Sequence, residues 1–129
     1  MSYAARHPGA STSSVAARLV DEGLRMDEHP GVMFRDGPAG RRAALVGGPD
    51  VWEIIRAVRS ARAAEPDLDE AAILELVSEN SGTGQRLIRT AVDYWSAYPR
   101  EVDALVEHAD TVETERLLAW ERTRRLLAQ

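Results

Sequence analysis

Four polar residues near the start of one predicted helix are of the types that read DNA bases. These residues are Thr83, Gln85, Arg86 and Arg89. In the major groove, arginine donates two hydrogen bonds to guanine, glutamine pairs with adenine, and the amides of a helix N-terminus can meet a phosphate. This chemistry requires a helix-turn-helix unit, because that unit places the N-terminal part of its second helix against the base edges.

The stretch from residue 69 to residue 98 has the pattern of such a unit. Apolar residues recur at helical spacing in two segments, namely Ile73, Leu76 and Val77, and then Leu87, Ile88, Ala91, Val92 and Trp95. The break over residues 78–84 is longer than the three or four residues usual for this unit, and Ser81 or Thr83 is expected to cap the second helix. The same pattern fits a helical hairpin in any small α domain, so both interpretations stay open.

Further arginines could neutralise phosphates. Arg41 and Arg42 follow the turn of a predicted β-hairpin, where they could clamp the DNA backbone. Arg56, Arg59 and Arg62 recur at helical spacing on the next helix, which is more typical of a solvated helix face. The predicted DNA-binding residues are therefore Thr83, Gln85, Arg86, Arg89, Arg41 and Arg42.

The sequence contains no recognisable catalytic or metal-binding pattern. Cysteine is absent, and His7, His29 and His108 lie far apart without a second ligand at helical spacing. No serine nucleophile motif, phosphate-binding loop or glycine-rich dinucleotide fingerprint occurs. We therefore expect a protein that is not an enzyme and that uses no catalytic residue, metal ion or cofactor.

The C-terminal segment has more apolar surface than one narrow stripe requires. A helix of about 18 residues is predicted to begin at Asp110 or Thr111, after a break in the preceding helix. Leu117, Trp120 and Leu127 could lie in the groove of a partner protein. Docking onto the protein's own core or onto a sister subunit is an equally good interpretation, because so apolar a helix is not expected to stay bare.

The remaining elements are helices and one hairpin. A helix is predicted from the serine-rich residues 11–14 to near Asp27, because His29 precedes Pro30 and is forced out of the helical region. In the hairpin, Val32 and Phe34 could face either Ala43 and Leu45 or Ala44 and Val46. A lone hairpin is marginally stable, so it must pack on the helices or pair with a second chain. Two further helices are expected to start after Asp50 and at Pro99.

The predicted fold class is mainly α: a small helical domain with a helix-turn-helix-like unit, one β-hairpin and a C-terminal helical arm. Residues 1–28 form the N-terminal helical segment, residues 29–109 the hairpin and helix-turn-helix-like domain, and residues 110–129 the C-terminal helix. A chain of 129 residues has the length of one domain.

The amino-acid composition limits the cellular environment and the class of binding partner that we expect for this protein. The net charge of −5 opposes a generic nucleic-acid coat, since phosphate neutralisation drives that kind of binding. The sequence has no apolar run long enough for a signal peptide or a membrane span, so we expect a soluble, cytoplasmic protein that does not contact a membrane.

Three motifs stand in a suggestive order along the chain: HPGVMFRDGPAGRRAALVGGPDVWEII, LDEAAILELVS and TAVDYWSAYPREVDALV. Over residues 29–106 the chain resembles the VapB-like antitoxins, a bacterial family of small domains usually paired with PIN-like toxins. The family's His-Pro start matches His29-Pro30-Gly31, and its helix after the turn matches residues 51–55. Its aromatic helix and closing segment match residues 91–95 and 99–103.

The chain departs from the family where Gly47, Gly48 and Pro49 replace a Gly-Thr-Arg turn, so no role of that threonine or arginine can be transferred. Residues 11–27 also resemble the second helix of ribbon-helix-helix repressors, which implies dimerisation through this segment.

These observations predict an antitoxin-like, DNA-binding repressor of a toxin-antitoxin operon that acts as a homodimer. Its helix-turn-helix would bind the operator, and its C-terminal helix would neutralise a toxin, which the resemblance implies to be PIN-like. The alternative is a protein-protein interaction module, an oligomeric adaptor that does not bind DNA.

Overall fold

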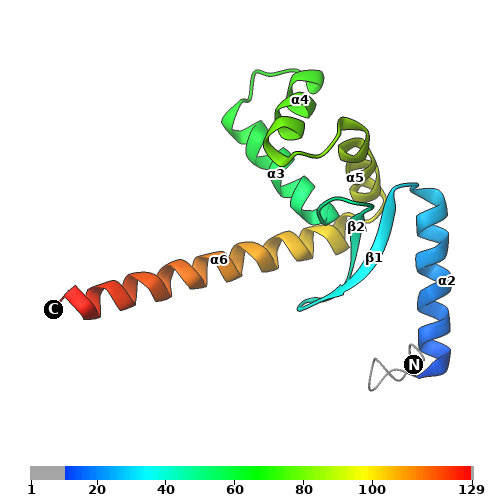
Figure 1. The fold of residues 1–129 in the computed structure, drawn as a ribbon, viewed down its shortest axis with the longest axis horizontal. Helices are drawn as coiled ribbons and strands as arrows, with labels where there is room; N and C mark the ends of the chain where they lie inside the picture. The colour runs from blue at the N-terminus through cyan, green and yellow to red at the C-terminus, as the bar shows by residue number, and fades with distance from the viewer. Residues whose placement is uncertain (1–10, 129) are drawn as a thin grey trace.

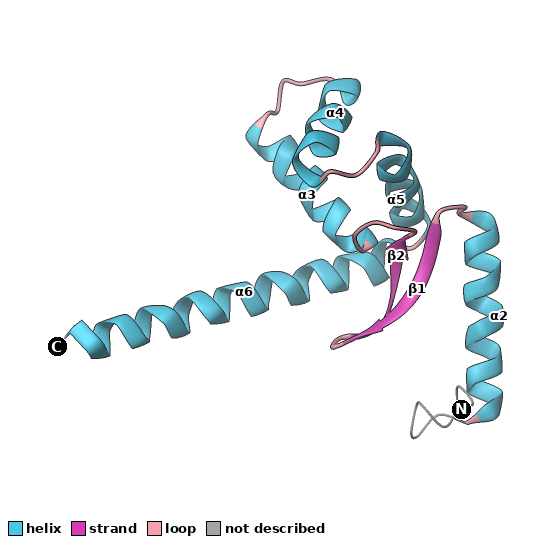
Figure 2. Ribbon diagram, viewed as in Figure 1, coloured by secondary structure: helices cyan, strands magenta, loops and turns pink. Residues whose placement is uncertain are grey.

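The computed structural model describes residues 11–128, so His7 and the start of the predicted N-terminal segment lie outside the described residues. The described chain is mainly helical (73%), with one two-stranded hairpin, which confirms the predicted fold class (Figure 2). Its elements are α2 (Thr12–Glu28), β1 (Val32–Gly37), β2 (Gly40–Leu45), α3 (Val51–Ala64), α4 (Glu70–Ser81), α5 (Gln85–Ala97) and α6 (Pro99–Ala128). Within residues 11–128, no helix has the length and hydropathy needed to cross a membrane.

Local signals place the N-terminal helix where the sequence predicts it. Ser11 caps α2 by accepting a hydrogen bond from the Ser14 backbone N–H at 3.1 Å. The helix ends at Glu28, and the Arg25 carbonyl then accepts from the His29 N–H, just before Pro30.

The hairpin adopts the first of its two predicted registers. Val32 pairs with Leu45 and Phe34 with Ala43, so these residues share the face that is turned to the core. The strands close at Gly37 and Gly40, and Gly40 has a positive φ of 102° that a residue with a side chain rarely adopts. The ribbon packs on its own helices, mainly α2 and α3.

The core lies where α3, α4 and α5 meet the hairpin and the first turns of α6. Asp50 is the predicted N-cap of α3, and it forms a capping box with Glu53. Tyr94 is the largest of the fully buried side chains, and the next largest are Leu45, Ile54, Ile88, Val51, Val77 and Val102. The stripe predicted for α5 is displaced toward Tyr94, while Leu87, Val92 and Trp95 are only partly buried. A tyrosine at the centre was not deduced from apolar spacing, because its hydroxyl needs a partner that spacing does not reveal.

α6 is one helix of 30 residues, so the predicted break at residues 109–110 is wrong. After Pro99 this segment contains no glycine or proline that would end a helix. Thr114 donates its side-chain hydroxyl to the Asp110 carbonyl, one turn earlier, at 2.9 Å. This hydrogen bond lies within α6, so Thr114 does not cap the start of a new helix. The last half of α6 projects away from the rest of the molecule (Figure 1), and we call residues 114–128 the arm.

α2 turns a different face to the core from the one its apolar residues suggest. Val15 and Glu22 are buried against the hairpin. The large apolar residues of the helix are exposed instead, and they are Leu19, Val20, Leu24 and Met26. The sequence shows that α2 is amphipathic. It does not show that the side with Glu22 faces the core, because a buried carboxylate is rare unless it is paired.

Truncation after Arg116 tests whether the arm is separate from the core. Every buried side chain of α6 lies before residue 113, so we expect the truncated chain to keep the thermal midpoint of the full chain. Its helical content, measured by far-ultraviolet circular dichroism, should fall in proportion to the residues removed. A loss of cooperative unfolding would contradict a separate arm, and the substitution Val106→Ala is the control that should destabilise the chain by about 1–3 kcal/mol.

Candidate DNA-binding and partner-binding surfaces

The turn between α4 and α5 is shorter than predicted. α4 extends to Ser81, so the turn consists of residues 82–84, the length that is usual for a helix-turn-helix unit. Gly82 ends α4 in the left-handed conformation, with a φ of 70°. The predicted capping residues, Ser81 and Thr83, are both wrong, because Gly84 occupies the N-cap position of α5 and Ser81 donates its hydroxyl to the Val77 carbonyl at 2.6 Å.

Thr83 is a structural residue of this turn. It is only 6% exposed, its N–H donates to the Ser81 hydroxyl, and its carbonyl accepts from the Ser78 hydroxyl at 2.7 Å. The side chain of Thr83 therefore lies inside the turn and not on the predicted DNA-binding face. Turn residues ordinarily lie on the surface, so no signal in the sequence points to the burial of Thr83.

Gln85, Arg86 and Arg89 lie together in the first two turns of α5, and all three are exposed. The first turn of α5 carries no acidic residue, so its N-terminal amides and these side chains form a small donor-rich surface. Arg89 contacts Glu70 of α4 through a hydrogen bond of 3.2 Å between exposed groups. Exposed pairs of this kind contribute little, about 0–1 kcal/mol, so a phosphate could replace Glu70.

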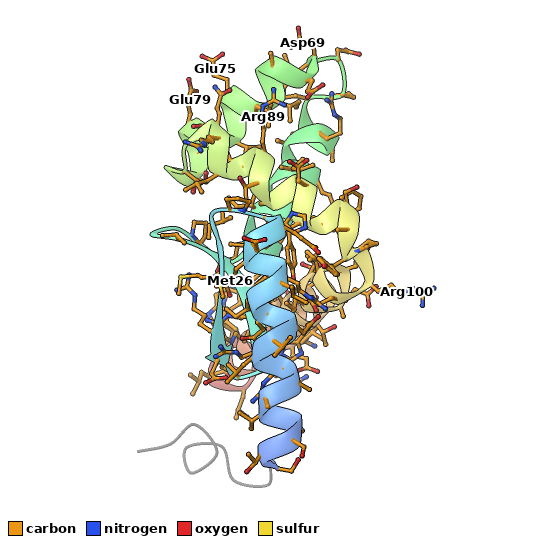
Figure 3. All side chains as sticks on the ribbon, turned by 90° about the vertical axis from the view of Figure 1, so that its right-hand side faces the viewer. Met26, Asp69, Glu75, Glu79, Arg89 and Arg100 are labelled. Atoms are coloured by element: carbon orange, nitrogen blue, oxygen red, sulfur yellow. The ribbon has the colours of Figure 1, made fainter. Side chains whose placement is uncertain are left out.

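Acidic residues surround this surface. Asp69, Glu75 and Glu79 lie at the same end of the molecule as Arg89, and their side chains point outward from α4 and its start (Figure 3). In a helix-turn-helix unit the first helix crosses the DNA backbone, where carboxylates oppose phosphates. The acidity of α4 therefore restricts any DNA contact to the start of α5.

Arg41 and Arg42 are not part of the α5 surface. Arg41 donates two hydrogen bonds, of 2.9 and 2.8 Å, to the buried carboxylate of Glu22 in α2. Arg42 bonds to Asp50 at the start of α3 and donates to the Asp36 carbonyl at 2.6 Å. Both residues lie near the hairpin turn, which points away from α4 and α5 (Figure 1).

The structure thus gives the hairpin arginines a structural role in place of the predicted phosphate clamp. Each guanidinium neutralises a buried carboxylate, and removing one partner of a buried pair typically costs about 3–5 kcal/mol. A phosphate could therefore bind Arg41 only by displacing Glu22. It could bind Arg42 only by displacing Asp50, which would keep contacts with Arg35 and with the Trp52 indole. The sequence signal for this arrangement is weak: Glu22 lies seven residues after the buried Val15, on the same side of α2.

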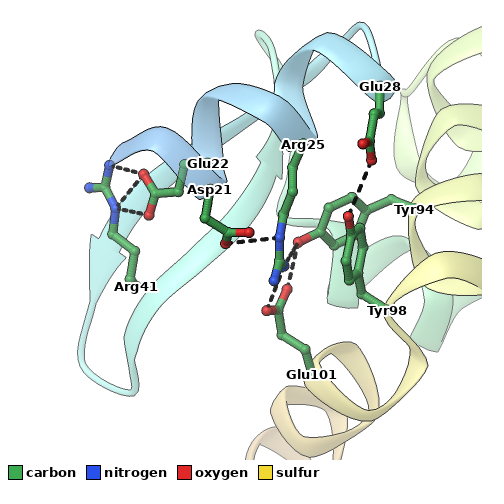
Figure 4. Close-up of polar contacts among 8 residues, drawn as sticks. All are labelled: Asp21, Glu22, Arg25, Glu28, Arg41, Tyr94, Tyr98 and Glu101. Carbon is green, nitrogen blue, oxygen red and sulfur yellow. Dashed lines mark hydrogen bonds and ion pairs between the residues drawn. The ribbon is translucent and has the colours of Figure 1, made fainter. Parts of the chain in front are cut away.

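Arg25 joins α2 to both α5 and α6. Its Nη1 donates to the Tyr94 hydroxyl at 2.9 Å and to Glu101 at 2.8 Å, and Tyr94 donates to the other oxygen of Glu101 at 2.5 Å (Figure 4). The guanidinium also lies over the ring of Tyr98, 3.9 Å from its centroid. Asp21, one turn earlier in α2, contacts the Arg25 Nε at 3.1 Å. This network, which we call the Arg25 cluster, fixes the position of α2 and was not predicted.

Burial and charge perturb the titration of the Arg25 cluster. Burial raises the pKa of Tyr94 above its ordinary value, and the hydrogen bond to Glu101 raises it further, while Arg25 lowers it. Burial lowers the pKa of Arg25, but its hydrogen bonds to Tyr94 and Glu101 outweigh that effect, so its pKa lies above the ordinary value. Tyr94 is therefore a neutral donor and Arg25 a permanent cation.

Arginines of α3 fix the direction of α6. Arg59 donates to Asp103 at 2.6 Å, and Asp103 also accepts from the Trp95 indole at 2.9 Å. These two hydrogen bonds lower the pKa of Asp103. Arg56 contacts both Asp110, at 2.9 Å, and Glu113. Two of the residues predicted to form a solvated face therefore bind α6, Arg59 near its start and Arg56 just before the arm begins.

The three residues predicted to bind a partner lie on the arm. Leu117 and Trp120 are each 54% exposed and Leu127 is 79% exposed. They continue the stripe of the buried residues Val102 and Val106, because the intervals along this stripe are 4, 11, 3 and 7 residues, all close to whole helical turns. The stripe thus passes from the core onto an exposed helix without changing sides.

The pH dependence of stability can reveal whether Tyr94 is neutral in the folded chain. A raised pKa stabilises the fold fully below the ordinary tyrosine pKa of 10, and this contribution is lost as the pH rises through the folded value. We expect the urea midpoint of the natural chain to fall more steeply between pH 9 and pH 11.5 than that of Tyr94→Phe. At pH 7 the variant should be less stable by about 1 kcal/mol. Parallel curves for the two chains would contradict the inferred titration.

Comparison with known proteins finds no matching family model, no similar curated protein and no similar solved structure. Functional conclusions must therefore come from the surfaces of this chain and from the motifs in its sequence.

Proposed function

We propose that this chain is an antitoxin-like repressor, in which the arm binds and neutralises a toxin and the start of α5 binds operator DNA. The exposed stripe of the arm is the observation that carries the proposal. Three large apolar side chains on one helical line, without a covering element in the described chain, suit the groove of another protein. The resemblance to VapB-like antitoxins supports a PIN-like toxin as that partner.

The arm is suited to this role because its direction is set in advance. Val102 and Val106 of α6 are buried in the core, and Arg56 and Arg59 add ion pairs to Asp110 and Asp103, so the first turns of α6 cannot pivot freely. A partner then has to order only the side chains of the arm, which lowers the entropic cost of binding.

DNA recognition would rest on Gln85, Arg86 and Arg89. The short turn of residues 82–84 supports the helix-turn-helix geometry, and the N-terminus of α5 presents its donors to solvent. In a homodimer, two such helices would meet successive major grooves about 34 Å apart. Such a repressor would act in the cytoplasm, where its operon is transcribed.

A protein-protein interaction module without DNA binding is the second candidate. Arg41, Arg42 and Arg89 all contact carboxylates of the chain, and the net charge is −5. Both candidates use the arm in the same way, so DNA binding distinguishes them.

Salt-dependent binding to the chain's own promoter tests the repressor. We expect Arg86→Ala to weaken binding by about 1–3 kcal/mol, because a base contact of arginine has that value. Arg100→Ala is the matched control, because Arg100 is exposed at the start of α6 and points away from α5 (Figure 3). If the natural chain shows no salt-dependent shift at low salt, the repressor is excluded and the interaction module remains.

Two matched pairs of leucines test the arm. Leu117→Ala with Leu127→Ala removes leucines from the stripe, whereas Leu118→Ala with Leu126→Ala removes exposed leucines from other sides of the same helix. We expect only the first pair to weaken binding of the protein encoded by the adjacent reading frame, by at least about tenfold. Isothermal titration calorimetry measures the dissociation constant of each double variant. Equal losses would show that hydrophobicity alone drives the contact, and no loss would exclude the stripe as the binding surface.

A further inference from the structure

We propose that two copies of this chain pair through the outer face of α2, with the helices antiparallel and Val20 of each copy packed over Gly23 of the other. The pairing specifies how the homodimer of the proposed function is built, and it rests on that function only for the expectation of a dimer. It can therefore hold even if the chain binds no DNA and no toxin.

The inner face of α2 is already occupied. Glu22 is bound by Arg41 of the hairpin, and Arg25 is bound by Glu101 of α6. These contacts on successive turns prevent the helix from rotating about its axis. In the view of Figure 3, α2 lies across the front of the molecule and no described element covers its outer side.

The outer face carries a continuous apolar strip. Ala16, Val20 and Leu24 follow each other at intervals of four residues, and Leu19 and Met26 lie along one edge of this strip. All five are exposed, and Val20 is 63% exposed. Single exposed apolar residues are ordinary, but a strip along most of a 17-residue helix indicates a contact with another apolar surface.

Gly23 shows what kind of contact this is. Glycine in the middle of a helix is less favourable than alanine, so its presence in α2 needs a reason. Nothing within the described chain supplies one: Gly23 has no positive φ, and a Cβ at this position would meet no atom within 4 Å. Gly23 follows Val20 by three residues and thus lies beside the same strip. The missing side chain leaves a depression into which a knob of a second helix can fit.

A second copy of the chain fits this strip through its own symmetry. In a two-fold pair, contacts are reciprocal, so the knob and the depression must come from the same helix. An antiparallel pair centred between Val20 and Gly23 places each Val20 over the partner's Gly23. The same register places Ala16 opposite the partner's Asp27, with the two Leu24 side chains along one edge of the contact and the two Leu19 side chains along the other. Every large residue of the strip then meets an apolar or small residue.

The charges at the two ends of α2 favour the same orientation. Asp27 lies in the last turn, where the helix dipole of its own chain disfavours a carboxylate, and the first turn contains no acidic residue. The antiparallel register brings Asp27 beside the partner's Ala16, in the N-terminal half of that helix and away from the carbonyl groups at its C-terminal end. A parallel pair would instead place the two Asp27 carboxylates side by side.

Sedimentation equilibrium of the full chain, without DNA or any partner, tests the pairing. We expect a dimer whose dissociation constant rises by at least about tenfold in Val20→Arg. Val46→Arg is the matched control, because Val46 is 57% exposed and lies after the hairpin, away from the strip. Gly23→Ala should stabilise each monomer through its higher helix propensity and yet weaken the dimer. Stabilisation without weakening would show that Gly23 has no role in pairing.

Introduced cysteines test the orientation, since the natural chain has none. Chains with Ala16→Cys should form disulfides with chains carrying Asp27→Cys, whereas neither variant should cross-link to itself. Self-cross-linking of each variant alone would indicate a parallel pair and overturn the register. A natural chain that stays monomeric up to about 1 mM, or one that becomes monomeric on truncation after Arg116, would overturn the α2 interface.

Discussion

Tyr94 is the residue on which the arrangement of the whole chain depends. Its ring is buried and meets His29 and Tyr98 at centroid distances of 5.4 and 4.8 Å. Its hydroxyl donates to Glu101 and accepts from Arg25. A tyrosine suits this place because its ring can enter a core while its polar end stays hydrogen-bonded at the boundary. One side chain of α5 thereby contacts α2 on one side and α6 on the other, and it links the two helices at the edge of the core.

Most arginines of this protein form contacts within the fold and are not free to form a basic surface. Arg41 and Arg42 neutralise buried carboxylates of α2 and α3, and Arg59 neutralises a carboxylate of α6. In an acidic chain with many arginines, most cations are therefore committed within the fold. The exposed arginines that remain lie at the start of α5, at the start of α6 and on the arm, and they include Arg86, Arg100, Arg116 and Arg122. Any DNA contact must then depend on shape and on a few side chains, because the overall charge opposes it.

Two helices expose apolar faces while their other sides are fixed by polar contacts. α2 is anchored through Arg25 and exposes Val20, and α6 is anchored through Asp103 and exposes Trp120. Hydrogen bonds between side chains are directional, so they fix the rotation of a helix about its axis more strictly than apolar packing would. The apolar faces thus remain available at defined positions on two different sides of the molecule. The two contacts proposed for this chain therefore use different sides of the molecule.

The sequence by itself determined the local elements, because their causes are local. Ser11 and Asp50 cap helices, Pro30 bars continuation of α2, and alternation sets the strands around a two-residue hairpin loop. It did not determine which side of α2 is inward or that the residues around Thr83 form so short a turn. The inward side of α2 depends on the pairing of Glu22 with Arg41, which lies on a different element. The short turn depends on Gly82 in the left-handed conformation and on the burial of Thr83. A charged residue near an apolar stripe is exposed or buried according to whether a distant partner reaches it, and only the tertiary structure decides that.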